Sequence, residues 1–341
     1  MKTWIARLFA VASLAAAAAT LASCVKEDEF DNTPEGNFEL LWKIIDEHYC
    51  FFEYKDIDWN LVHDQYARRI TPDMPSKALF EVCGDMLAEL QDGHVNLYAA
   101  HDVAAYRKWY EDYPSNFNDS IARLYLGKTG DYMTAAGMLY KAFDDNIGYI
   151  RYASFSDGVG DGNLSEVLSY LAICDGLIID VRDNGGGNLD NAQRIAARFT
   201  DSRVLTGYIM HKTGPGHNEF SQPQPVWLEP SPHIRWQKPV VVLTNRHSYS
   251  ATNDFVNMMR LLPGVTIMGD RTGGGSGLPF SAELPNSWSV RFSASPVLDA
   301  ARQHIEWGID PDIRVDMTVE DIRNNRDTMI EAARELLRSG A

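Results

Sequence analysis

Two nearly continuous apolar runs, at residues 176–181 and 240–244, constrain the fold of this 341-residue chain more than any other feature. Short runs rich in Ile, Val and Leu without polar alternation are typical of strands buried on both faces. Each run ends in a turn and is followed by a helical spacing of apolar residues, at 189–199 and 251–262. This repeated order predicts an α/β domain with a largely parallel sheet.

Similar signals assign most of the remaining chain to three regions. Three amphipathic patterns that end before Gly93 predict an N-terminal helical module at 38–100. Aromatic, acidic and glycine residues are mixed at 101–145, which we expect to be a connecting or lid segment. The α/β core is expected at 146–341. Its other expected elements are strands at 148–155 and 265–269, helices at 165–174 and 319–337, and a hairpin at 278–294.

The first residues have the pattern of an export signal. Two basic residues precede an alanine-rich apolar run, and Leu-Ala-Ser-Cys at 21–24 resembles the lipobox of bacterial lipoproteins. The pattern predicts a signal peptide at 1–23, lipidation of Cys24 and a flexible tether at 24–37. The alternative is an ordinary signal peptide that ends near a cysteine.

The residues after Cys24 favour an anchored protein of the cell envelope. Lys-Glu-Asp-Glu at 26–29 resembles the surface-export signal of Bacteroidetes lipoproteins, although a solvated charge run has the same composition. We therefore expect a lipid anchor in the membrane. The outer membrane is the expected location. If the run at 26–29 is a surface-export signal, the protein would be exposed at the cell surface.

The charge balance excludes several classes of partner. Asp and Glu number 47 against 31 Lys and Arg, and the formal net charge of −16 at pH 7 repels phosphate backbones and anionic lipids. No basic stripe offsets this charge, so we expect no nucleic-acid partner. Apart from the N-terminal run, no stretch is long and apolar enough for a membrane span, which excludes a polytopic membrane protein.

Three cysteines besides Cys24 predict neither a disulfide framework nor a metal site. Cys83 and Cys174 lie on apolar faces of expected elements and are predicted to be buried free thiols. Cys50 has no partner in a CxxC pair. No cluster of His and Cys has the spacing of metal ligands, so we expect no metal.

The candidate chemistry lies where the two apolar strands end. After the first, three glycines at 185–187 expose backbone N–H groups suited to an oxyanion, or form only a tight turn. Arg182 and Asp183, just before them, either bind a substrate carboxylate or form a surface pair. After the second, Ser250 begins a helix, whose dipole stabilises negative charge on the serine oxygen. The alternative is that Ser250 or Ser248 only caps the helix.

Four segments, in order, resemble the C-terminal-processing, or tail-specific, serine peptidase family, which includes the tricorn core. They are DVRDNGGG at 180–187, NRHSYSA at 245–251, GDRTGGG at 269–275 and GIDPD at 308–312. The resemblance covers roughly residues 38–315 and implies a ClpP/crotonase-like α/β core. It implies that Ser250 is the nucleophile that attacks a peptide bond. The implied oxyanion hole uses the backbone N–H groups of Ala251 and of Gly185 or Gly186.

The chain departs from the processing branch of that family and is more similar to the tricorn-like branch. The processing branch places a lysine base where this chain has Gly275, and no lysine follows Lys238. The tricorn-like branch uses an Asp-Gly-His sequence that matches His94 and a glutamate that matches Glu306. The resemblance therefore implies a site of Ser250, His94 and Glu306. His94 would be the general base, and Glu306 would hold it by accepting a hydrogen bond from its other ring nitrogen.

The serine that precedes the histidine in the tricorn-like branch is replaced here by Gly93. Its absence leaves open a degenerate family member that binds a peptide or other ligand without cleavage, and an esterase or amidase would share the same site chemistry. Only about 50 residues separate His94 from Gly148, too few for the PDZ module of the processing branch. We expect a peptide or protein substrate and no cofactor, and the sequence leaves the oligomeric state open.

Overall fold

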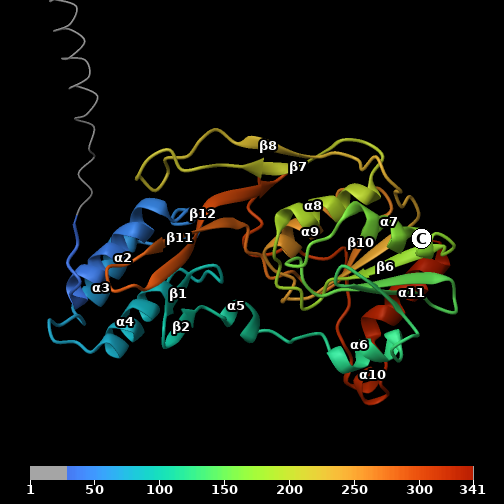
Figure 1. Ribbon diagram of the computed structural model, residues 1–341, viewed down its shortest axis with the longest axis horizontal. Coiled ribbons are helices and arrows are strands. Elements are labelled where there is room, and N and C mark those ends of the chain that lie inside the picture. The colour runs from blue at the N-terminus through green and yellow to red at the C-terminus, as the bar shows by residue number, and fades with distance from the viewer. Residues whose placement is uncertain (1–28, 341) are drawn as a thin grey trace, which may run out of the picture.

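The computed structural model describes residues 29–340. The predicted signal peptide at 1–23, the lipidation site Cys24 and the first part of the tether lie outside these residues. Figure 1 shows an elongated molecule with helices α2 to α4 and the strands β11 and β12 at one end and an α/β core at the other. In the described part of the chain, no helix combines the length and the apolar character that a membrane span requires.

A seven-stranded sheet forms the centre of the α/β core within residues 29–340. Its order is β13-β10-β9-β6-β5-β4-β3, parallel from β13 to β5 and antiparallel at β4 and β3. The strands are β3 (Met133–Ala135), β4 (Met138–Ala142), β5 (Ile147–Tyr152), β6 (Gly176–Asp180), β9 (Val240–Thr244), β10 (Val265–Gly269) and β13 (Ile313–Arg314). The prediction of a largely parallel sheet in an α/β core is confirmed.

Helices cover both faces of this sheet, which explains why its strands are apolar without alternation. Leu177 and Ile179 of β6 pack under one group of helices, whereas Ile178 packs on the opposite face. The first group is α7 (Asp161–Leu171), α8 (Leu189–Ala196) with the 3₁₀ turn Ala197–Phe199, and α9 (Ala251–Met259); the second is α6 (Asp119–Leu126) and α11 (Thr328–Ser339).

A second sheet, antiparallel and six-stranded in the described residues, joins the two ends of the molecule. Its order is β2-β1-β12-β7-β8, with β11 also paired to β12. The strands are β1 (Asn96–Ala99), β2 (Asp102–Ala105), β7 (Val204–Ile209), β8 (Gln224–Leu228), β11 (Gly277–Glu283) and β12 (Ser289–Asp299). The expected hairpin is confirmed as β11 and β12, whereas β7 and β8 were not predicted. Because β12 pairs with β1, β11 and β7, it ties the N-terminal strands to the core.

The N-terminal helices pack on the second sheet and share its hydrophobic core. They are α2 (Pro34–His48), α3 (Trp59–Ala67) and α4 (Ser76–Ala88), followed by the single turn α5 (Lys108–Glu111). Leu41 and Leu87 belong to one buried cluster with Trp288 and Phe292, which come from the C-terminal half of the chain. The region predicted as a helical module therefore also contains β1 and depends on the β11–β12 hairpin for its core.

The start of α2 corrects the predicted extent of the tether. The helix begins at Pro34, inside the segment 24–37 that was expected to be flexible. The Thr33 side chain caps it by accepting the Gly36 N–H at 3.0 Å, and proline suits the first turn because its missing N–H would have no helical partner.

The C-terminal helix and the start of the core also differ from expectation. The pattern at 319–337 forms two helices, α10 (Val319–Arg323) and α11, because the Asp327 side chain caps α11 by accepting the N–H groups of its first residues. The core sheet starts before residue 146, since β3 and β4 add two antiparallel strands to its edge.

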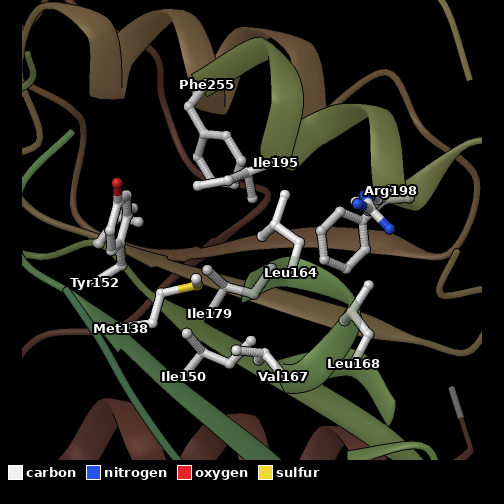
Figure 2. A pocket seen from close by; sticks show the side chains of 12 residues that line it. Met138, Ile150, Tyr152, Leu164, Val167, Leu168, Ile179, Ile195, Arg198 and Phe255 are labelled. Atoms are coloured by element: carbon white, nitrogen blue, oxygen red, sulfur yellow. The ribbon is translucent and has the colours of Figure 1, made fainter. Parts of the chain in front are cut away.

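A small cavity within the core is a packing gap rather than a ligand site. Figure 2 shows apolar side chains converging on it from the sheet and from α7 to α9, among them Leu164, Ile179 and Phe255. Its volume of about 20 Å³ is about that of one water molecule. Arg198 lies at its edge, where its guanidinium bonds to the Ile234 carbonyl at 2.9 Å.

The three described cysteines are buried free thiols, which confirms the prediction for Cys83 and Cys174. Burial raises the pKa of the Cys83 thiol to about 12. A thiol with so high a pKa carries little thiolate at neutral pH, so it has the low reactivity of a structural cysteine.

Candidate active site

The two strand ends singled out in the sequence lie side by side because β6 and β9 are adjacent parallel strands. Their register pairs Leu177 with Val240 and Asp180 with Leu243. The glycine turn after β6 and the Ser250 turn after β9 therefore open at the same edge of the sheet. The carboxyl ends of strands are where ligands bind in open α/β sheets.

Ser250 occupies a strained turn between β9 and α9. Its φ of 58° and ψ of −126° are unusual for a residue with a side chain, and such conformations cost about 1–3 kcal/mol. The turn is held by the Ser250 N–H, which donates to the Gly274 carbonyl at 2.8 Å. The Ser250 side chain makes no capping bond to α9, and Ser248 donates its hydroxyl to the Val181 carbonyl. The interpretation that either serine only caps the helix is therefore wrong.

The Ser250 hydroxyl meets the imidazole of His94. Oγ of Ser250 lies 2.9 Å from Nε2 of His94, across 156 positions of sequence. His94 is buried in the turn between α4 and β1, and Asp92 accepts its backbone N–H at 2.8 Å. This contact fixes the backbone position from which the His94 side chain extends. The structure thus brings together two of the three predicted site side chains.

Burial favours the neutral form of the His94 imidazole. Desolvation lowers the pKa of His94 to about 4, although the charge of Asp92 acts in the opposite direction. A neutral imidazole with its hydrogen on Nδ1 can accept a proton at Nε2, where Ser250 lies. Nδ1 is buried, and within residues 29–340 no partner meets ordinary hydrogen-bond geometry, although a backbone interaction with Gly277 acts to raise the pKa of His94.

Glu306 does not hold His94 as expected. Its Oε1 accepts a hydrogen bond from Lys55 Nζ at 3.0 Å, and its Oε2 accepts the Ser276 backbone N–H at 2.8 Å. The prediction of a direct contact between Glu306 and His94 is wrong, because the carboxylate is turned toward a cation and a backbone donor instead.

Lys55 is the site residue that the sequence analysis missed. Its side chain is 2% exposed, and Nζ lies 3.0 Å from Glu306 and 3.5 Å from Asp92. It also donates to the Leu90 carbonyl at 3.2 Å. Lys55 lies in the loop after α2, far in sequence from Ser250, and no motif spacing connects the two residues. Its place in the site is evident only in the tertiary structure, where it is a buried lysine beside Asp92 and Glu306.

Lys55, Asp92 and Glu306 form a buried cluster with one cation for two carboxylates. Burial opposes ionisation of Asp92, but Lys55 and hydrogen bonds, including one from Ser293 at 2.9 Å, lower the pKa of Asp92. Burial and the charge of Asp92 raise the pKa of Glu306. Tyr49 donates to Asp92 at 3.0 Å. The cluster therefore keeps Asp92 ionised beside His94 and joins three distant segments of the chain.

Two aromatic rings account for the departures from the family pattern at positions 93 and 275. A Cβ on Gly93 would lie 2.5 Å from Nε1 of Trp109, and a Cβ on Gly275 would lie 2.4 Å from the Tyr249 ring. The rings of Trp109 and Tyr249 stack with their centroids 4.1 Å apart. They fill the space that a serine at 93 or a lysine at 275 would need.

The glycine turn brings backbone donors close to Ser250. A Cβ on Gly186 would lie 2.8 Å from the Ser250 Cβ, so a side chain does not fit there. The Gly186 N–H donates to Asn184 Oδ1 at 3.0 Å, which removes Gly186 from the predicted oxyanion donors. The N–H groups of Gly185 and Ala251 have no hydrogen-bond partner in residues 29–340, so both remain available.

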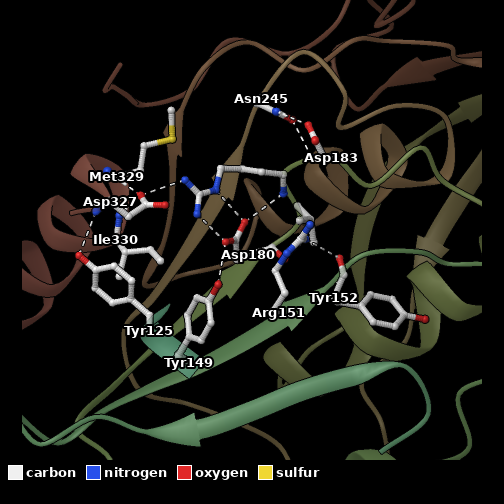
Figure 3. A network of polar contacts seen from close by, with 12 residues as sticks. Tyr125, Tyr149, Arg151, Tyr152, Asp180, Asp183, Asn245, Asp327, Met329 and Ile330 are labelled. Atoms are coloured by element: carbon white, nitrogen blue, oxygen red, sulfur yellow. Dashed lines mark hydrogen bonds and ion pairs between the residues drawn. The ribbon is translucent and has the colours of Figure 1, made fainter. Parts of the chain in front are cut away.

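Neither predicted role of Arg182 is correct. Its guanidinium is fully buried and donates to both oxygens of Asp180, at 2.9 and 2.6 Å, and to Asp327 at 3.0 Å. Figure 3 shows Asp180 and Asp327 in this polar network. Asp183 instead accepts a hydrogen bond from Asn245 at 2.7 Å. The arginine network anchors α11 to the end of β6, and the Asp183–Asn245 bond links the turn after β6 to the turn after β9.

Ser250 lies between two depressions in the surface. A cleft of about 600 Å³ is lined by the glycine turn and by Trp109 and Tyr110, so the segment at 101–145 supplies one wall. A pocket of about 290 Å³ is lined by the start of β11 and by α9. Ser250 and His94 line both, which suits an extended chain that crosses the serine.

Two other histidines, His247 and His304, pack against aromatic rings. His247 lines the larger cleft, but its ring packs against Tyr110 with centroids 4.2 Å apart. His304 stacks on Tyr54 at 4.0 Å. Within the described residues, no group of three or more His, Cys, Asp or Glu side chains is arranged to hold a metal ion.

Two protein-family models match the two parts of the site. Residues 146–315, which include Ser250, match peptidase family S41. Residues 30–88, which include Lys55 and end shortly before His94, match the tricorn protease C1 domain.

Solved structures extend the similarity to most of the chain. A putative peptidase from Parabacteroides merdae is 59% identical, with a TM-score of 0.86 over 90% of this chain and 97% of that one. Mature CPAF complexed with lactacystin shares the fold, with a TM-score of 0.66 at 12% identity over 90% and 97% of the two chains. A putative tricorn-like protease subunit from Sulfurisphaera tokodaii is 28% identical over 48% of this chain and 17% of its own length. The chain spans less than a fifth of the curated relatives that it matches.

An α/β core that sets a strained serine against a buried imidazole is the arrangement of a serine hydrolase. The near-complete match to the Parabacteroides peptidase and the match of residues 146–315 show that the chain belongs to peptidase family S41.

The low pKa of His94 predicts activity that extends into acid. If His94 is the base, the rate constant for labelling of Ser250 by a fluorophosphonate falls only as pH approaches about 4, because the folded protein keeps the imidazole neutral through its usual value of 6.5. The unfolded chain binds that proton near pH 6.5, so stability also decreases as pH falls from 6.5 to 4. The Glu306→Gln and Asp254→Asn variants are the controls, since the pKa of each carboxyl is raised to about 7. An acid limb near 6.5 that persists in both variants would contradict the prediction.

Removal of the Lys55 cation is expected to destabilise the protein. The Lys55→Met variant leaves Asp92 and Glu306 buried without a cation, so the free energy of unfolding should fall by about 3–5 kcal/mol in urea denaturation. Lys77→Met, at an exposed lysine of α4, is the matched control and should change it by less than about 1 kcal/mol. Equal losses in the two variants would show that the cluster does not depend on Lys55.

Proposed function

We propose that this protein is a serine peptidase that cleaves peptide bonds through an acyl-enzyme on Ser250. The observation that carries the proposal is the distance of 2.9 Å between Ser250 Oγ and Nε2 of the buried His94. The serine lies at the N-terminus of α9, with the larger cleft on one side and the smaller pocket on the other.

In the proposed reaction Ser250 Oγ bonds to the carbonyl carbon of the substrate while its proton passes to His94 Nε2. The oxyanion accepts hydrogen bonds from the N–H groups of Ala251 and Gly185. When the C–N bond breaks, His94 gives its proton to the leaving amine. A water molecule then attacks the ester with His94 as base, which releases the acid and restores Ser250.

Glu306 contributes to this site as a positioning residue. It holds the Lys55 ammonium beside Asp92, and Asp92 holds the backbone of His94. The acidic member of the predicted triad thus acts through two other residues, and it does not touch the imidazole.

The geometry favours peptide hydrolysis over the alternatives. The absent serine and lysine that suggested a degenerate family member are replaced by the stacked rings of Trp109 and Tyr249, while the pair of Ser250 and His94 is retained. Depressions of about 600 and 290 Å³ lie on both sides of the serine, which gives room for a chain on each side of the scissile bond.

A fluorophosphonate probe tests the nucleophile directly. The native protein should label, and Ser250→Ala should lose labelling and lower kcat for peptide cleavage by about 10³- to 10⁶-fold. In-gel fluorescence and mass spectrometry of the labelled peptide are the measurements.

Ser248→Ala is the matched control for this experiment, because Ser248 is buried and donates to Val181. This variant should still label. Retained labelling in Ser250→Ala with an intact thermal transition would assign the nucleophile to another residue.

We also propose that Cys24 carries a lipid that anchors the protein in the cell envelope, at the outer membrane. The support is the apolar run and the Leu-Ala-Ser-Cys sequence at 21–24.

Metabolic labelling with a clickable palmitate analogue tests the anchor. Cys24→Ala should lose the label and move from the membrane fraction to the soluble envelope fraction, because a free thiol is the site of acylation. Cys50→Ala, at a buried thiol, should keep the label. An unlabelled native protein would show that the segment is an ordinary signal.

A further inference from the structure

The pocket beside Ser250 continues along α9 into a second pocket, and Asp254 lies where the two meet. The first has a volume of about 290 Å³ and the second about 260 Å³. Leu189, Asp254 and Val297 line both. A side chain that enters beside Ser250 along these walls therefore reaches the carboxylate of Asp254.

The distance along α9 matches a long side chain. Asp254 follows Ser250 by four positions, one turn of helix, which rises about 5.4 Å. The acyl carbon bonded to Ser250 lies over the start of α9, where the Ala251 N–H is available to its oxygen. The side chain on the acyl side of the scissile bond is therefore the one closest to a pocket bounded by α9.

The Asp254 carboxylate has no partner of opposite charge. Among residues 29–340 its side chain makes no hydrogen bond and no ion pair. Burial and the charge of Glu306 raise the pKa of Asp254 to about 7. The side chain is only partly buried, so its unpaired negative charge stays accessible from the pockets, where an incoming cation gains a partner.

The other charges of the pockets do not neutralise Asp254. Arg291 lines the first pocket and also the larger cleft on the far side of Ser250, and it makes no hydrogen bond or ion pair with Asp254. Asp190 lines the second pocket and is exposed, so it adds a second negative charge. The second pocket is otherwise mostly apolar, with Ile209 and Met258 among its walls.

We propose that these joined pockets bind a lysine or arginine side chain on the acyl side of the scissile bond, with Asp254 as the residue that determines this specificity. The apolar walls receive the aliphatic stem and Asp254 receives the cation. The inference rests on the proposed peptidase function and adds its substrate class. A carboxylate in the first turn of α9 would also stabilise the helix dipole, so the test needs a readout other than stability.

The experiment compares peptide coumarin amides that differ only in the residue before the scissile bond. In the native protein kcat/KM should be higher for Lys and Arg than for Leu. In Asp254→Asn the ratio of kcat/KM for Lys to that for Leu should fall about 100-fold, because the loss of the carboxylate acts on the basic substrate alone. Asp190→Asn, the matched control at the exposed carboxylate of the second pocket, should lower the ratio much less.

A second measurement needs no variant. Diphenyl phosphonate probes with Lys or Leu at the reacting position should label native Ser250 at different rates, with Lys faster. Equal rates, or a preference for Lys that Asp254→Asn leaves unchanged, would overturn the specificity while the labelling itself upholds the peptidase. Absence of both labelling and cleavage with every probe would overturn the proposed function and this inference with it.

Discussion

The parallel pairing of β6 with β9 is the constraint on which the rest of the site depends. Because their register aligns Asp180 with Leu243, the glycine turn and the Ser250 turn open together at one sheet edge. Because the two turns lie so close together, each needs an unusual residue or backbone conformation. Gly186 has no room for a side chain next to Ser250, and Ser250 itself is held at a φ of 58°. The Asp183–Asn245 bond and the buried Arg182 network hold both turns in place.

The imidazole comes from outside this core, so the site exists only if the N-terminal segment docks on it. β12 provides the physical link, since it pairs with β1 near His94 and its apolar residues share a core with α2 and α4. The charge cluster of Lys55, Asp92 and Glu306 strengthens this link, because it takes one member from each of three distant segments. Removal of any one charge from a buried cluster of this kind leaves the others uncompensated and lowers stability, so the position of His94 depends on all three side chains.

Burial acts in opposite directions on the titratable groups around Ser250. It lowers the pKa of His94, which keeps the imidazole neutral, and it raises the pKa of Asp254, which has no cation beside it in residues 29–340. The same surroundings therefore disfavour charge on both groups. The stacked rings of Trp109 and Tyr249 form part of those surroundings and fill the space that a side chain at position 93 or 275 would need.

The sequence by itself determined the α/β core and the two strand ends, because apolar periodicity and glycine turns are local signals. The candidates Ser250 and His94 came from the resemblance of its motifs to the peptidase family. The sequence did not predict β7 and β8 or the division of the C-terminal helix. It also assigned Glu306 to His94 and overlooked Lys55. Only the tertiary structure decided which donor each carboxylate faces, that the Gly186 N–H is already bonded, and that Asp254 lies without a partner in a pocket. Side-chain partners across hundreds of residues depend on packing geometry, which local sequence patterns do not encode.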